Sequence, residues 1–103
     1  MININLLSLF GIKSPEEKRQ DLDENIVITQ QEISRLEQEI QESKREINRL
    51  EMVIRKSNVK ANTTPIQTKK IDLEVAVQDK DVLIRRLKER LEGLYAQKRK
   101  LAA

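Results

Sequence analysis

The chain has no cysteine and no histidine, and these two absences exclude several kinds of chemistry. Without cysteine there is no disulfide framework, no thiolate nucleophile and no cysteine metal site. Without histidine, the commonest general base and the commonest transition-metal ligand are missing. Its two glycines, Gly11 and Gly93, do not form a glycine-rich phosphate loop. We therefore predict that the protein is not an enzyme and binds no cofactor or metal.

Aromatic residues are almost absent too, with one Phe, one Tyr and no Trp. Compact cores rely on aromatic side chains for much of their buried area. Here 38% of the residues are hydrophobic, nearly all of them Ile, Leu and Val, and 36% are charged. This mixture is typical of long helices that meet along a narrow seam. The composition predicts an all-α fold.

The only two prolines, Pro15 and Pro65, mark two predicted helix starts. In Ser14-Pro15-Glu16-Glu17 the serine is a predicted N-cap, the proline takes the first helical position and glutamate closes a capping box. Thr64-Pro65-Ile66-Gln67 repeats the same order. We predict an apolar docking segment over residues 1–13 and a hairpin over residues 14–103, with a helix over 15–56, a loop over 57–64 and a helix over 65–102.

Both predicted helices carry apolar residues at spacings that alternate between four and three. The pattern runs through more than four heptads in the first helix, which is a specific signal for a coiled coil. In the second helix it is equally regular but interrupted by lysines. The predicted seam consists of Ile26, Ile33, Leu36, Ile40, Ile47, Leu50, Ile54, Leu73, Val77, Ile84, Leu87, Leu91 and Leu94.

The charges beside the seam favour an antiparallel pair over a parallel homodimer. A parallel homodimer would place Glu32 opposite Glu37, and like charges at such positions are unfavourable. Folding the chain back instead brings Ile26 to Leu94 and joins two helices of similar length by a short loop. We predict a long antiparallel helical hairpin, a two-helix coiled coil that oligomerises.

Residues 71–77 allow a second interpretation, because apolar and polar side chains alternate there with period two. A strand at this place would give a helix–strand–helix arrangement that resembles prefoldin-type chaperone subunits. The heptad pattern continues through the stretch without a break, which favours a helix.

Aliphatic residues also remain outside the seam, where the predicted hairpin has no core to bury them. Such residues are common on surfaces, but a group of them can form a contact site. We expect a second contact face for another protein or for a copy of the chain. Its predicted members are Ile28, Val53, Val75, Val82 and Leu83.

The segment 1–13 is apolar and nearly uncharged. It is too short to span a bilayer, and it lacks the basic start and the cleavage site of a secretory signal. We predict that it docks into a partner's groove; a shallow membrane anchor, or packing against the hairpin near Leu22, Leu94 and Leu101, would also suit its composition. The predicted docking residues are Ile4, Leu6, Leu7, Leu9, Phe10 and Ile12.

Leu9-Phe10-Gly11, followed closely by a basic residue and then by a long hairpin, resembles the start of the membrane-remodelling ESCRT-III and PspA proteins. The resemblance covers about a dozen residues and the general architecture. It implies a membrane-surface assembly protein that is anchored by its N-terminal segment.

The end of the second helix is basic, although the net charge of the chain is only +3. Phosphate groups could bind there, but no aromatic stacking platform or known nucleic-acid motif accompanies the basic residues. The basic residues are Arg85, Arg86, Lys88, Arg90, Lys98, Arg99 and Lys100. We expect protein partners and self-association rather than nucleic acid, although the basic end is also compatible with a nucleic-acid-associated coiled coil.

These patterns predict a non-catalytic structural or adaptor subunit of a larger protein assembly, intracellular or in a virion-type particle. Docking would use the N-terminal segment. A membrane-surface assembly protein and a prefoldin-like chaperone subunit are also compatible with the sequence.

Overall fold

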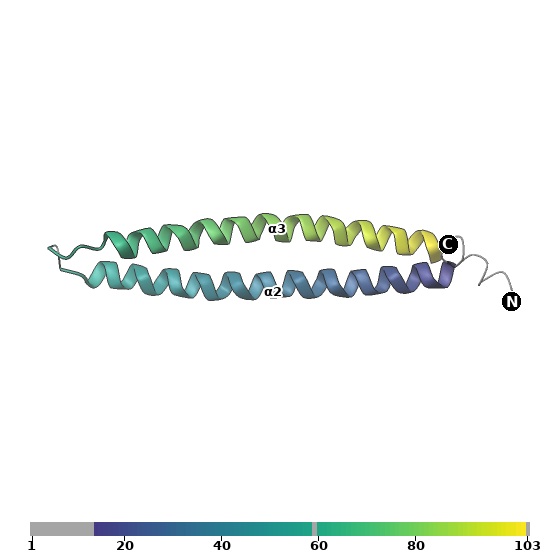
Figure 1. Ribbon diagram of the computed structural model, residues 1–103, viewed down its shortest axis with the longest axis horizontal. Coiled ribbons are helices and arrows are strands. Elements are labelled where there is room, and N and C mark those ends of the chain that lie inside the picture. Colours follow the sequence, from purple (N-terminus) through teal and green to yellow (C-terminus); the bar gives the residue numbers. More distant parts are fainter. Residues whose placement is uncertain (1–13, 59, 103) are drawn as a thin grey trace. The chain divides into compact units, whose positions relative to one another are not determined.

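The computed structural model describes residues 14–58 and 60–102. Two helices contain most of them: α2 spans Pro15–Lys56 and α3 spans Thr64–Ala102. They are joined by a loop, so that the chain folds back into a helical hairpin (Figure 1). The predicted all-helical hairpin is therefore confirmed. Because α3 runs through residues 71–77, the alternative of a strand there is wrong, and the described part of the chain contains no strand.

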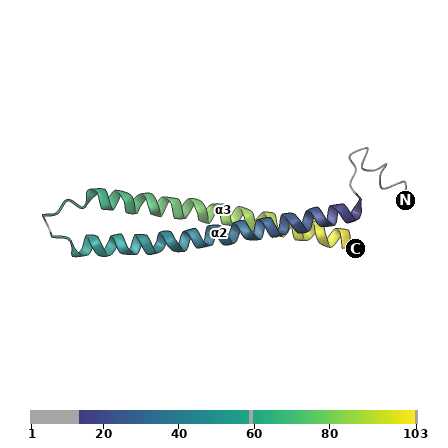
Figure 2. The same cartoon turned by 60° about the horizontal axis from the view of Figure 1, so that its bottom comes forward.

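The hairpin divides into two compact units, each formed by a segment of α2 and a segment of α3. Among the described residues, the end unit comprises those up to Glu32 together with those from Leu87 onward. The loop unit comprises Ile33–Arg86 and includes the connection between the helices. In the loop unit the two helical segments run side by side in opposite directions, as Figures 1 and 2 both show.

Ser14 caps the start of α2, as the sequence predicts. The Ser14 hydroxyl oxygen accepts a hydrogen bond from the Glu17 backbone N–H at 3.2 Å, and the Ser14 carbonyl accepts one from the Lys18 N–H at 2.9 Å. The bond to the hydroxyl satisfies a backbone donor that has no partner inside the helix, and the bond to the carbonyl is the first bond of the helix itself. Glu16 and Glu17 in the first turn and Arg55 and Lys56 in the last also complement the helix dipole.

The start of α3 differs from the prediction, which made Thr64 the cap. Thr63 takes that role. Its carbonyl accepts a hydrogen bond from the Gln67 backbone N–H at 2.9 Å, and its hydroxyl oxygen accepts one from the Gln67 side-chain amide at 2.9 Å. The Asn62 side chain accepts the Thr64 N–H at 3.1 Å, which draws Thr64 into the helix. The helix consequently begins one residue earlier than its predicted first residue, Pro65.

The seam residues of the end unit pack together. Leu22 and Ile26 of α2 form a cluster with Leu94 of α3, and the partly buried Leu91 and Leu101 pack against it. Ile26 and Leu94 thus share one cluster, as antiparallel pairing requires. Their burial removes apolar area from water, worth roughly 25 cal/mol per Å².

The seam of the loop unit is buried along both helices. Ile47, Ile54 and Leu73, and Leu87 at the edge of the end unit, are half-buried. The buried members are Ile33, Leu36, Ile40, Leu50, Val77 and Ile84. Every residue of the predicted seam is therefore buried or half-buried.

One polar residue, Thr29, is buried within the row of aliphatic seam residues and is 4% exposed. Its hydroxyl donates a hydrogen bond to the Asn25 carbonyl at 2.6 Å, one turn earlier in α2. A buried hydroxyl without a partner would destabilise the fold, and this bond within the helix prevents that cost.

Gly93 lies inside α3, where a Cβ atom would meet nothing within 4 Å. Glycine in a helix interior costs about 0.5–1 kcal/mol relative to alanine, because it loses more backbone freedom on folding. We expect Gly93→Ala to stabilise the hairpin by that amount and to raise the melting temperature by roughly 2–8 °C. Thermal denaturation followed by circular dichroism measures the change, and a lower melting temperature would contradict an open helical position.

Candidate interaction surfaces

Ion pairs within the hairpin cover the edges of the seam in the loop unit. Lys80 occupies a seam position in α3, and its ammonium group lies 3.5 Å from a Glu39 carboxylate oxygen of α2. Lys70 lies 3.3 Å from Glu51 in the same manner. Both lysines are half-buried, so their stems pack on the seam while their charged ends reach water. The seam lysines therefore have partners inside the hairpin.

Glu46 and Arg49 form an ion pair on α2, close to Lys69 of α3. The Glu46 carboxylate accepts hydrogen bonds from the Arg49 guanidinium at 2.9 and 2.5 Å and lies 3.7 Å from the Lys69 ammonium. The hydrogen bond from Arg49 is the largest cause that holds the pKa of Glu46 below its usual value. Desolvation opposes it, and the charges of Arg49 and Lys69 add to the lowering. The same hydrogen bond raises the pKa of Arg49. Arg49 is exposed and Glu46 is half-buried at the surface, so the pair contributes little to stability.

The end unit has two polar links between its helical segments. The Lys98 ammonium lies 2.7 Å from an Asp23 carboxylate oxygen, and the Gln30 amide donates a hydrogen bond to the Tyr95 hydroxyl at 2.6 Å. One of the basic residues near the end of α3 is therefore paired within the hairpin.

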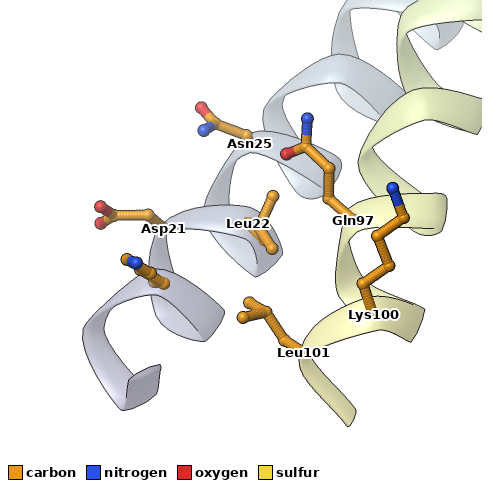
Figure 3. Close-up of a pocket in the computed structure, with 7 residues that line it drawn as sticks. Asp21, Leu22, Asn25, Gln97, Lys100 and Leu101 are labelled. Atoms are coloured by element: carbon orange, nitrogen blue, oxygen red, sulfur yellow. The ribbon is translucent and has the colours of Figure 1, made fainter. Parts of the chain in front are cut away.

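A pocket of about 400 Å³ lies between the start of α2 and the end of α3. Leu22 and Leu101 face each other across it, with polar side chains around them (Figure 3). Its lining consists of Lys18, Asp21, Leu22, Asn25, Gln97, Lys100 and Leu101. The pocket thus offers an apolar floor with a polar rim, but its size and polarity alone do not indicate a catalytic site.

The members of the predicted second contact face belong to both units of the hairpin. Ile28 belongs to the end unit, where it is 60% exposed and lines a hollow with Val27, Asp23 and Glu24. Val53 belongs to the loop unit and is half-buried. The other three predicted members, Val75, Val82 and Leu83, are exposed on α3 in the loop unit.

Val75 and Val82 line up along α3 with Ile71, a residue that was not part of the predicted face. The three residues form an aliphatic stripe. Ile71, Val75 and Val82 are 58%, 50% and 41% exposed. At about 100° per residue they fall within an arc of about 40°, on the side of α3 opposite the seam. The spacing of four and seven residues was the sequence signal that could have grouped them.

Acidic residues flank the stripe on both sides. Asp72 and Asp79 lie along one border and Glu74 and Asp81 along the other, and all four are exposed. Of these, Glu74 has a cationic neighbour on its own helix, the Lys70 ammonium at 3.7 Å. We call the stripe and its borders the acidic–apolar face; it consists of Ile71, Asp72, Glu74, Val75, Asp79, Asp81 and Val82.

The predicted docking residues Ile4, Leu6, Leu7, Leu9, Phe10 and Ile12 lie outside the described residues. Within the described ranges, no helix combines the length and apolar character needed to cross a bilayer. The same ranges contain no group of three or more acidic, histidine or cysteine side chains arranged to hold a metal ion.

Comparisons of the chain with family models, with curated proteins and with solved structures find no match. The function proposed below therefore relies on the surfaces of the hairpin itself.

Proposed function

We propose that the protein is a non-catalytic structural or adaptor subunit of a larger intracellular or virion-type assembly. In this role the seam holds the two helices together, and aliphatic side chains outside it bind other helices. The acidic–apolar face of α3 supports the proposal most directly, because three aliphatic residues are aligned there on the side away from the seam.

The energetics of the exposed side chains support a contact role. Ile71, Val75 and Val82 each expose about half of their surface. Burying an aliphatic side chain completely is worth about 1.5–3 kcal/mol, so covering three half-exposed ones supplies a few kcal/mol. The seam buries only one stripe of each helix. The stabilisation from so small a core rarely exceeds the cost of lost chain entropy by a wide margin. A partner that covers the stripe would therefore add noticeably to the stability of the hairpin.

Solution mass tests the proposal. We expect the mass from light scattering or sedimentation to rise above the 12.1 kDa of one chain as protein concentration increases. The melting temperature should rise with it, because association stabilises the folded state by mass action. A single-chain mass at every concentration, with a constant melting temperature, would contradict self-assembly.

A flotation assay with anionic liposomes separates a helix-binding subunit from a membrane-surface protein. A subunit that binds other helices should stay at the bottom of the gradient, whereas flotation with the vesicles would support a membrane-surface protein instead.

A further inference from the structure

The outer side of α2 in the loop unit carries the opposite charge from the acidic–apolar face. Arg45, Arg49, Met52 and Lys56 are all exposed and fall within an arc of about 60° on the side away from the seam. Arg55 borders them and is also exposed. We call these five residues the basic face. Met52, which is 52% exposed, gives it an apolar centre.

Three acidic residues lie near the basic face: Glu42 is exposed at its edge, and Glu46 and Glu51 contact basic groups within the hairpin. Glu51 lies 3.3 Å from Lys70 across the seam, and Glu46 lies close to both Arg49 and Lys69. On α3 the only basic residue between Ile71 and Val82 is Lys80, which lies at the seam beside Glu39. The two faces are therefore of opposite sign, and each has an apolar centre.

We infer that the acidic–apolar face of one copy packs against the basic face of a second copy, which deepens the self-assembly proposed above and rests on it. Charge complementarity selects this pairing. Two acidic–apolar faces would bring Asp72, Glu74, Asp79 and Asp81 of both copies together, and two basic faces would bring their arginines together. Like charges across an interface are costly, whereas opposite charges fix the choice of partner.

The pairing joins two different surfaces, so a pair of copies still has one free acidic–apolar face and one free basic face. Such a heterologous contact adds further copies until a ring closes or a row of hairpins forms. Both faces belong to the loop unit, and therefore the contact needs only residues of Ile33–Arg86 from each copy.

The contact is small. Residues 71–82 span only about 17 Å along the helix axis. A contact of this length is shorter than that of stable interfaces, which bury about 800 Å² of surface per partner. We therefore expect a weak contact, and the measurements need protein concentrations up to about 1 mM. Exposed charges are screened beyond about 10 Å at 0.1 M salt, so self-association should weaken as salt is raised.

Two variants of the full chain, each blocked on one face, test the pairing. The first carries Val75→Lys and Val82→Lys, which remove the stripe from α3 and reverse the charge at its centre. The second carries Arg45→Glu and Met52→Glu, which make the basic face acidic. All four positions are exposed and outside the seam, so circular dichroism should show unchanged helicity. Gln38→Lys, exposed on α2 before the basic face, is the matched control.

We expect each blocked variant alone to associate at least about tenfold more weakly than the unchanged chain. The Gln38→Lys control should associate as strongly as the unchanged chain. Mixing the two blocked variants should restore association, giving species that contain both in equal amounts. Native mass spectrometry with one isotopically labelled variant measures this composition.

Three results would overturn the pairing. If the second variant alone still associates, α3 faces pair with one another. If the unchanged chain associates but mixing restores nothing, self-assembly stands and uses another surface. If the unchanged chain stays a single copy up to about 1 mM, both this pairing and self-assembly fail.

Discussion

Ile40→Asn is expected to lower the free energy of unfolding of the hairpin by about 2–5 kcal/mol. Ile40 is 5% exposed in the loop unit, so the substitution removes a buried aliphatic side chain and places an amide where it has no hydrogen-bond partner. Small domains are stabilised by only about 5–15 kcal/mol, and a two-helix hairpin lies at the low end of that range. The variant should therefore lose much of its helicity at room temperature.

Ile28→Asn is the matched control, because it makes the same chemical change on the same helix at a position that is 60% exposed. Surface substitutions of this kind usually change stability by less than about 0.5 kcal/mol. Urea denaturation followed by circular dichroism, at protein concentrations low enough to keep single chains, compares the two variants. Equal losses of stability would mean that the seam does not run through Ile40.

The helices and their seam could be predicted because the signal is local and repeated. A heptad pattern of more than four repeats specifies which stripe of a helix is buried, whatever that stripe packs against. The same pattern decided against a strand at 71–77, where a two-residue alternation competed with it over a much shorter stretch. Ser14 was equally predictable as a cap, because it directly precedes Pro15 and carries a side chain that accepts a backbone hydrogen bond.

The start of α3 could not be fixed in the same way. Asn62, Thr63 and Thr64 all carry side chains that accept hydrogen bonds from backbone N–H groups. The choice among them depends on how the loop approaches the helix. In the structure the Asn62 side chain accepts a hydrogen bond from the Thr64 N–H, and the Thr63 hydroxyl accepts one from the Gln67 side chain. No single-residue preference specifies this arrangement.

The exposure of side chains outside the seam was harder to predict, because it depends on how much of each side chain the opposite helix covers. Val53 and Val75 were both assigned to the second contact face, yet Val53 is half-buried while Val75 is 50% exposed. The heptad pattern places Val53 next to the seam residue Ile54 and Val75 two residues from Leu73 and Val77, but it does not specify how much of each side chain the opposite helix covers. Once the covered side of α3 is known, Ile71 joins Val75 and Val82, and the acidic residues become the borders of the same face.

Phe10→Asp, or deletion of residues 1–13, is expected to abolish attachment to the partner assembly without unfolding the hairpin. The segment contains Leu9 and Phe10, and burying each such side chain in a partner is worth about 1.5–3 kcal/mol. A charged aspartate in place of Phe10 removes that gain and adds a desolvation cost. Co-purification of the tagged chain with the native assembly, compared between variants, measures attachment.

The structure explains why stability should survive the change. The first turn of α2 is closed by the Ser14 hydroxyl and carbonyl, which accept hydrogen bonds from Glu17 and Lys18. All of these groups remain in a chain that begins at Ser14. The seam, too, is built from residues after position 14, so the melting temperature should change little.

Asn5→Asp is the control for the charge itself, since it adds a carboxylate to the same segment without removing an apolar side chain. Attachment should weaken far less with this variant than with Phe10→Asp. A large fall in melting temperature on deletion would show that the segment packs on the hairpin. Unchanged attachment together with unchanged stability would show that residues 1–13 do not dock at all.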